Sequence, residues 1–230
     1  MKTGKSRAAS ILIGLATAIV IVALAILPFL TPQWVAFEQS RANATGWTGF
    51  TTEELRAATD AILVDLVLGG DFDVEIGGTP VLNEREQGHM ADVRTVFRGL
   101  WILALLSLVV LVAASRRADR AGTWRAVRGG AIGLTIGVVV IGVVGLVAFD
   151  QLFELFHRIF FPAGSYLFDP TTERLVQLFP FQFWEETAIV VGVVIITIAL
   201  GVAVVAGRRA GQAAASAPTP ELAAAAGSGT

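Results

Sequence analysis

Only two histidines occur in the 230-residue sequence, and each has a carboxylate three residues away. His89 is followed by Asp92, and His157 is preceded by Glu154. Side chains three residues apart share one face of a helix, so each carboxylate could orient the neighbouring imidazole. Because an imidazole gives and takes protons near neutral pH, we expect the two histidines to meet in one acid–base site.

Other interpretations use the same residues. The ligand types allow a metal site with histidine and carboxylate ligands, formed by His89, Asp92, Glu154 and His157. In a non-catalytic membrane assembly protein, each histidine would instead be a partly buried residue bonded to its carboxylate. Ser165 is an alternative nucleophile, although a Gly-Ser pair in a loop is more typical of a turn. A thiol nucleophile and disulfides are excluded, because the sequence contains no cysteine.

The elements that must position these residues are membrane helices. The chain is 54% hydrophobic and 16% charged, with a mean hydropathy of +0.69, which is too apolar for an ordinary soluble domain. Segments of about 20 apolar residues are long enough to cross a bilayer, and they lie at residues 8–30, 97–114, 131–149 and 187–206. The first ends without a small-residue cleavage site, which favours a retained anchor. These features predict an all-α integral membrane protein with four transmembrane helices.

The distribution of charge predicts the orientation. The N-terminus, the loop at residues 115–128 and the segment after the fourth span carry ten of the seventeen basic residues but only two of the nineteen acidic ones. Lys and Arg gather on the cytoplasmic side, so we expect both termini to be cytoplasmic. Residues 1–209 then form one membrane domain with outer loops at 31–96 and 150–186. The composition of residues 210–230 predicts a disordered cytoplasmic tail.

The first outer loop predicts a small extracytoplasmic α+β region. Thr51 and Glu54 have the spacing of a capping box, and apolar residues then recur at helical spacing as far as Leu66. Residues 72–76 and 79–82 alternate as two short strands around a two-glycine turn. A second cap at Asn83 predicts an unbroken helix that carries His89 into the second span.

The second outer loop is rich in aromatic residues, which predicts a re-entrant or interfacial segment in the outer leaflet. Residues 162–164, Pro-Ala-Gly, are expected to form its turning point. Thr171 or Thr172 is expected to cap a short helix that ends before Pro180.

Two motifs resemble a known family. They are His-Met-Ala-Asp-Val-Arg at residues 89–94 and Phe-His-Arg-Ile-Phe-Phe at residues 156–161. Together with the layout of residues 8–206, they resemble a bacterial four-helix integral membrane family that includes the lipoprotein intramolecular transacylase. The chain has Tyr166 where a tryptophan is expected in the second motif.

The resemblance implies an acyltransferase of the bacterial cytoplasmic membrane with its active site on the extracytoplasmic side. In that family, the sn-2 acyl chain of a diacylglyceryl-cysteine lipoprotein moves to the α-amine of the same cysteine, which gives the lyso form. The family's two essential histidines would correspond to His89 and His157. The implied partners are the diacylated lipoprotein N-terminus and membrane phospholipid, with no nucleic acid, no metal and no cofactor.

The residues themselves suit this chemistry. An α-amine has a pKa near 8 and is mostly protonated at neutral pH, so its attack on an ester requires a base, and the departing alkoxide requires an acid. We expect His89 to be the base, because Asp92 could orient its ring, and His157 to be the acid. The residues expected to orient the histidines, or to bind an oxyanion or lipid, are Asp92, Arg94, Glu154, Arg158 and Tyr166.

Overall fold

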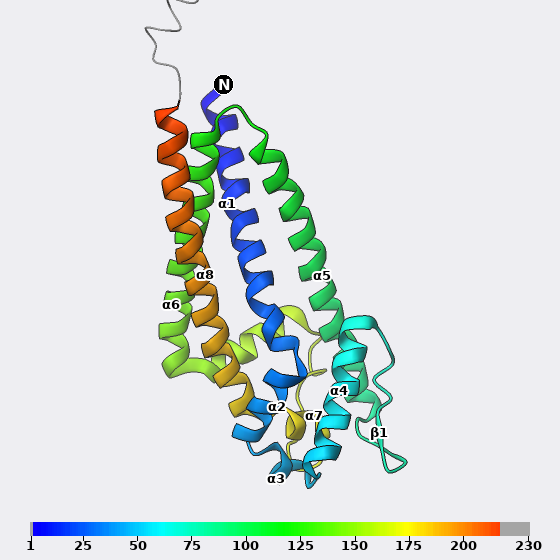
Figure 1. The fold of residues 1–230 in the computed structure, drawn as a ribbon. Helices are drawn as coiled ribbons and strands as arrows, with labels where there is room; N and C mark the ends of the chain where they lie inside the picture. Colours follow the sequence, from blue (N-terminus) through cyan, green and yellow to red (C-terminus); the bar gives the residue numbers. More distant parts are fainter. Residues whose placement is uncertain (1, 217–230) are drawn as a thin grey trace, which may run out of the picture. The chain divides into compact units, whose positions relative to one another are not determined.

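The computed structural model describes residues 2–216, with side chains from residue 7, and is almost entirely helical (Figure 1). The elements in chain order are α1 (Lys2–Ile26), the 3-10 helix η1 (Leu27–Leu30), α2 (Pro32–Arg41), α3 (Ala44–Thr48), α4 (Thr52–Leu68), β1 (Glu75–Ile76), β2 (Thr79–Pro80), α5 (Glu84–Ser115), α6 (Arg120–Phe160), α7 (Arg174–Leu178) and α8 (Phe181–Ala215). Helix α8 therefore includes the first residues of the predicted tail, which are not disordered. The remainder of that tail, residues 217–230, lies outside the described residues.

Four helices are long and apolar enough to cross a membrane, as the sequence predicted. They comprise Arg7–Leu30, Glu84–Ser115, Arg120–Phe160 and Phe181–Ala215. The last three extend well beyond the apolar segments predicted for them, since polar residues at their ends continue the helical backbone. The side of the membrane on which each end lies stays a prediction.

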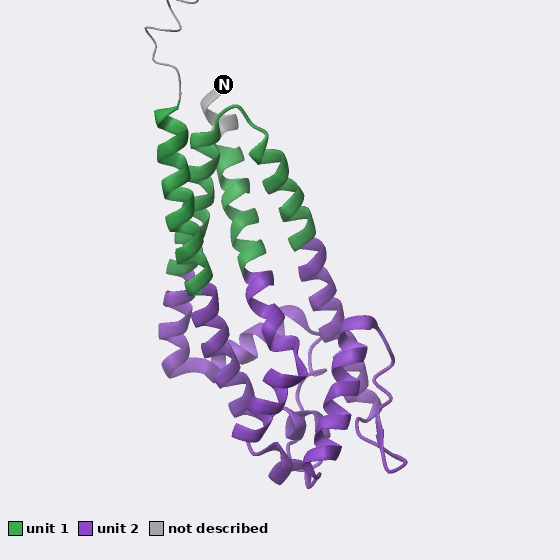
Figure 2. Ribbon diagram, in the orientation of Figure 1, with its two compact units in different colours: residues 1–21, 104–136, 196–230 green, residues 22–103, 137–195 purple. Residues whose placement is uncertain are grey.

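The chain forms two compact units (Figure 2), one of residues 1–21, 104–136 and 196–230, the other of residues 22–103 and 137–195. Within the first unit, α1 and α6 touch backbone to backbone at Gly14 and Gly130. A Cβ on Gly130 would lie 2.3 Å from the Gly14 carbonyl oxygen. Only glycine at position 130 permits this approach without a shift of one helix.

The second unit has its own hydrophobic core. The predicted apolar face of α4 is buried from Leu55 to Leu66 and packs with residues from far along the chain, including Leu178 and Phe183. Buried Gln39 on α2 donates a 2.9 Å hydrogen bond from Nε2 to the Leu178 carbonyl oxygen. The core is thus assembled from residues 35–90 and 175–183, which are separated by the remainder of α5 and by α6.

Two local predictions from the first outer loop are confirmed. Thr51 and Glu54 form the reciprocal capping box at the start of α4. Strands β1 and β2 pair antiparallel with Ile76 opposite Thr79, around the turn at Gly77 and Gly78. Each strand has only two residues, because Pro80 cannot donate a hydrogen bond to extend the ladder.

Candidate functional site

The start of α5 positions His89. The side-chain oxygen of Asn83 accepts hydrogen bonds from the amides of Arg85 (2.9 Å) and Glu86 (3.0 Å), as the predicted cap requires. Glu86 is buried and accepts from the amides of Asn83 (2.7 Å) and Leu175 (2.6 Å). These bonds fix the first turn of α5 to α7, and His89 follows on the next turn.

A change of direction in α6 positions His157. The backbone of Ala148 is non-helical (φ −146°, ψ 38°), and residues 149–160 continue as a separate helical segment. The sequence predicted the end of the span at residue 149 but a loop after it. Helical residues 149–160 instead present Phe153 and His157 on one face, four residues apart.

The two histidines lie side by side within the second unit. Their ring centroids are 6.1 Å apart and their planes differ by 19°. Buried Phe161 lies beside both rings, with centroid distances of 4.7 Å to His89 and 5.3 Å to His157. The expected juxtaposition of the two histidines is confirmed, despite their separation in sequence.

The two imidazoles have different polar surroundings. Nδ1 of His157 lies 2.7 Å from the Phe153 carbonyl oxygen. A carbonyl oxygen only accepts, so this Nδ1 carries a hydrogen, and the Nε2 of a neutral His157 bears the lone pair. Nδ1 of His89 is buried and has no hydrogen-bond partner among the residues that the structure describes. His157 therefore has a fixed tautomer, while His89 has no protein partner at Nδ1 to fix its own.

Aromatic rings surround the pair and form what we call the histidine pocket. His157 lies 4.2 Å from Phe153 and 5.1 Å from Tyr166, and His89 lies 5.4 Å from Phe168, measured between ring centroids. Apolar walls of this kind limit the access of bulk water to the two imidazoles. Besides the two histidines, Tyr166 is the predicted site residue that lies in this pocket.

A loop latch, formed by Arg85, Phe168 and Glu173, holds the aromatic loop against His89. Arg85 pairs with Glu173, donates a 2.9 Å hydrogen bond to the Leu167 carbonyl oxygen, and places its guanidinium 4.7 Å from the Phe168 ring. Burial acts to raise the pKa of the Glu173 carboxyl, but hydrogen bonds, above all from Arg85, outweigh burial and set the pKa below its usual value. Sequence reasoning missed this latch, although Arg85 lies in the segment that precedes His89.

Two predicted site residues on α5 do not bond to either histidine, contrary to the expectation from sequence. Among the residues described, Asp92 makes no hydrogen bond with His89. Arg94 donates to the backbone oxygens of Asp65 (3.4 Å) and Gly70, and its guanidinium lies 5.0 Å from the Phe72 ring. Arg94 thus connects α5 to the end of α4, because two backbone acceptors and a ring face are available there.

The structure also separates Glu154 and Arg158 from His157. They approach each other at 3.7 Å, and their side chains are 61% and 66% exposed. The two side chains pair with each other at the exposed surface, and His157 takes a backbone oxygen as its partner instead. In the described part of the chain, no group of three or more histidine, aspartate or glutamate side chains is arranged to hold a metal ion.

The turn of the aromatic loop matches the prediction. The amide and hydroxyl of Ser165 donate to the Pro162 carbonyl oxygen at 3.1 and 3.0 Å, which engages Ser165 in the turn. The short helix α7 ends before Pro180, as expected, but its first flanking residue is Glu173. Thr171 does not cap it, because its hydroxyl donates to Asp169.

Phe153, Phe161 and Phe168 are the pocket residues that sequence reasoning did not single out. Phe161 lies inside the second motif, four residues after His157, so helical spacing could have placed it beside the imidazole. No local signal marks Phe168, which reaches His89 only because the loop folds back.

Comparisons with known proteins agree on one family. The sequence model of "Lipoprotein intramolecular transacylase Lit" matches residues 11–184. No curated protein is significantly similar to the chain in sequence.

Among solved structures, the chain is similar to the membrane integral lipoprotein intramolecular transacylase Lit from Bacillus cereus. The TM-score is 0.76 at 17% identity, over 93% of this chain and 100% of the other. Two forms of the same protein, in which one histidine is replaced by arginine or by alanine, give TM-scores of 0.69 and 0.68 at 16% identity. Each covers 94% of this chain, and 96% and 98% of the respective variant chains are covered. At this identity, the likeness shows the fold.

Proposed function

Because the chain belongs to the lipoprotein intramolecular transacylase Lit family, we propose that it moves the sn-2 acyl chain of a diacylglyceryl-cysteine lipoprotein to the α-amine of the same cysteine. The product is the lyso-form lipoprotein. The observation that carries the proposal is the pair of imidazoles 6.1 Å apart in an aromatic pocket. The nucleophile belongs to the substrate, so the proposed reaction requires no cysteine of the protein, and the sequence contains none.

The proton balance explains why two histidines are useful. The substrate amine arrives mostly as an ammonium and must lose two protons to become an amide. Its nitrogen attacks the ester carbonyl carbon, the bond between that carbon and the sn-2 oxygen breaks, and the oxygen takes one proton. The second proton is released to water. Two bases in one pocket can hold both protons during the transfer.

The surroundings of the rings suggest a division of roles that reverses the sequence expectation. His157 bears its lone pair on Nε2, because its Nδ1 donates to the Phe153 carbonyl oxygen. We therefore propose that His157 accepts the proton that the substrate nitrogen loses during attack. His89 takes the first proton from the ammonium and delivers it to the sn-2 oxygen. With Nδ1 unpartnered, His89 can change tautomer without breaking a protein hydrogen bond. Tyr166, beside His157, is our candidate donor to the tetrahedral oxygen.

The substrate is proposed to enter from the lipid bilayer. The helical segment 149–160 carries exposed apolar side chains besides the ring that faces His89, namely Leu155, Phe156, Ile159 and Phe160. An amphipathic helix of this kind lies at a membrane interface with its apolar side in the acyl region. Lipid tails could therefore pass along this segment while the cysteine stays in the polar layer.

The proposed location of the pocket is the extracytoplasmic face of the bacterial cytoplasmic membrane. The uneven distribution of Lys and Arg supports it, since ten of the seventeen lie in the termini and the connection between the second and third spans. Cysteines introduced at Ser6 and Asp73 should react with impermeant reagents from opposite sides. Labelling of both from outside intact cells would overturn this topology.

The reaction can be tested by mass spectrometry. The protein is expressed with a diacylated lipoprotein in cells that do not otherwise make the lyso form, and the mass and fragmentation of the N-terminal peptide are measured. We expect an N-acyl, S-monoacylglyceryl peptide of the same total mass as the diacyl peptide, distinguished by its fragments.

The matched control is Ser165→Ala. It removes a hydroxyl that donates a hydrogen bond within the turn of the aromatic loop. This variant should retain most of the activity. An unchanged diacyl peptide in the presence of folded, membrane-inserted wild-type protein would overturn the proposed function.

A further inference from the structure

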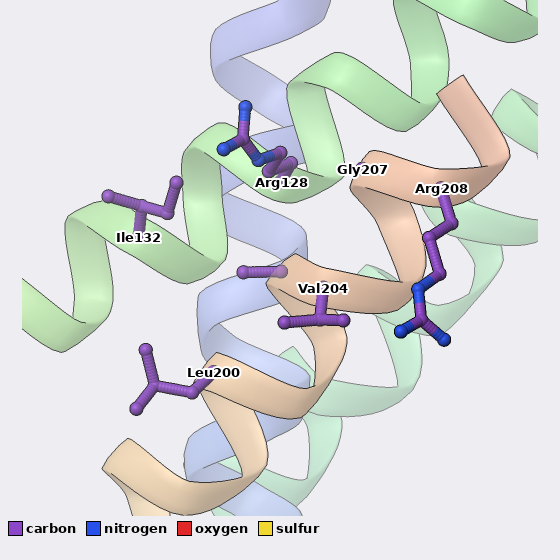
Figure 3. Close-up of a pocket in the computed structure, with 7 residues that line it drawn as sticks. Arg128, Ile132, Leu200, Val204, Gly207 and Arg208 are labelled. Carbon is purple, nitrogen blue, oxygen red and sulfur yellow. The ribbon is translucent and has the colours of Figure 1, made fainter. Parts of the chain in front are cut away.

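A groove in the first unit lies between α6 and α8 (Figure 3). It is an open groove of about 520 Å³, lined by Arg128, Ile132, Leu200, Ala203, Val204, Gly207 and Arg208. The two helices run in opposite directions, because α6 leaves the end of the unit at which α8 finishes (Figure 1). Both arginines therefore lie at one end of the groove, and the apolar residues continue from them.

On each helix, the spacing in sequence places the apolar lining residues in line with the arginine. Ile132 follows Arg128 by four residues, and Leu200 and Val204 precede Arg208 by eight and four residues. Residues four apart share a helix face, so each helix contributes an apolar stripe that ends in a cation. A ligand that fits both stripes has an anionic head and a hydrocarbon tail.

The positive charges of this groove are not neutralised by the protein. Arg128 and Arg208 are exposed and form no ion pair with any residue in the described ranges. The surrounding chain adds to the positive charge, since residues 115–128 carry five arginines and one aspartate. An anion bound here would therefore meet cations that have no competing carboxylate.

Gly207 lets Arg128 reach across α8. A Cβ at position 207 would lie 3.4 Å from both Cδ and Nε of Arg128, so the side chain rests directly on the glycine. The arginine stem thereby closes the charged end of the groove over α8. This contact distinguishes Arg128 from an arginine that merely extends into the headgroup layer.

We propose that this groove is a binding site for one anionic phospholipid, independent of the histidine pocket. Arg128 and Arg208 bind the phosphate, and one acyl chain lies along Ile132, Leu200 and Val204. Under the predicted topology, the lipid belongs to the cytoplasmic leaflet, opposite to the leaflet that supplies the substrate. Its role is to join α6 to α8 at the end of the groove that the two arginines make positive.

Native mass spectrometry of the full chain in detergent can test the site. Phosphatidylglycerol, phosphatidylcholine and soluble glycerol phosphate are titrated separately. We expect one tight phosphatidylglycerol adduct, with phosphatidylcholine and glycerol phosphate binding at least about tenfold more weakly, because they lack the net charge or the acyl chain.

Matched variants separate a built site from general positive charge. Arg128→Gln with Arg208→Gln should weaken the tight adduct about tenfold or more, whereas Arg116→Gln with Arg117→Gln removes the same charge outside the groove and should leave it in place. Val204→Trp fills the groove with both arginines intact and should also weaken it. Equal weakening by both arginine pairs, or equal affinity for phosphatidylcholine or glycerol phosphate, would overturn the proposal.

Discussion

His89 and His157 reach the same pocket from contrasting regions. His89 lies on a helix whose first turn is capped by Asn83 and tied to α7 by buried Glu86, and its Nδ1 has no partner. His157 lies after the break at Ala148 on a segment with an exposed apolar side, and its Nδ1 is bound to its own helix. The buried region holds the histidine whose tautomer is free, and the exposed region holds the one whose tautomer is fixed.

This difference is the basis for the two roles that we propose in proton transfer. A ring with a fixed tautomer presents its lone pair before substrate binds, which suits a base. A ring with an unpartnered nitrogen can respond to the substrate, which suits the group that receives a proton and passes it on. If the two surroundings produce two functions, substitutions of the two histidines should differ in their effects.

The largest effect is expected from removal of either imidazole. His89→Ala and His157→Ala should each reduce formation of the lyso form by about 10²- to 10⁴-fold, the usual contribution of a general acid or base. N-terminal peptide mass spectrometry measures the product, and thermal unfolding in detergent checks the fold. Full activity in a folded His157→Ala protein would refute the two-histidine mechanism.

Isosteric amides should separate the two roles. His157→Asn retains an N–H group near the Phe153 carbonyl oxygen but has no basic nitrogen, so its activity should be as low as that of His157→Ala. His89→Gln retains a polar donor and should exceed His89→Ala by about tenfold, within the contribution of one hydrogen bond to a transition state. The initial rate of lyso-form production is measured for all four variants. If His157→Asn restored activity and His89→Gln did not, the proposed roles of the two histidines would be exchanged.

Loss of the loop latch should have an intermediate effect. Arg85→Ala removes the ion pair with Glu173 and the contact with Phe168, so we expect about a tenfold loss of activity and a loss of about 1–3 kcal/mol in the free energy of unfolding. The control is Arg158→Ala, which breaks the exposed pair with Glu154 and should change the free energy of unfolding by less than about 0.5 kcal/mol. Equal effects of the two substitutions would show that the latch does not position the loop.

The latch also predicts an acid dependence. The pKa of Glu173 is lowered in the folded protein, so its stabilising contribution is present above the unfolded value of about 4.3 and is lost as the pH falls through the lowered pKa. Unfolding measured from neutral to acid pH should show a smaller loss in Glu173→Gln than in the wild type. An identical acid response in both would contradict a native ion pair.

The smallest effect is expected at Asp92. Its carboxylate does not bond His89, so Asp92→Asn should change the rate less than about twofold. A loss as large as that of the loop latch would restore the sequence expectation that Asp92 orients His89. The rate at saturating lipoprotein is the informative measurement, since orientation of a base affects chemistry more than binding.

The predictions from sequence succeeded where local signals decide structure. Capping at Thr51 and Asn83 follows from backbone amides that need an acceptor at a helix start, and the side chains that meet this need stand at fixed spacing. The meeting of the two histidines also followed from chemistry, because both lie in polar segments beside predicted spans. The number of long apolar helices was likewise evident from hydropathy alone.

The predictions failed where a tertiary contact replaced a local one. Asp92 and Glu154 have the spacing of partners for the histidines, but a backbone oxygen is closer to His157, and Arg158 is available to Glu154. The break in α6 occurs at an alanine, Ala148, and not at a proline or glycine that would have predicted it. Phe168 contacts His89 because Arg85 and Glu173 hold the loop. The spacing of residues in the sequence does not predict a contact of this kind.

The assembly of the second unit from two distant chain segments has a consequence for biosynthesis. Domains generally acquire structure as the ribosome delivers the chain from its N-terminus. Until Leu178 and Phe183 emerge, the apolar face of α4 and the amide of Gln39 lack their native partners. His157 also follows His89 by two membrane crossings. A nascent copy therefore has no complete histidine pocket until the chain has been synthesised as far as Phe183.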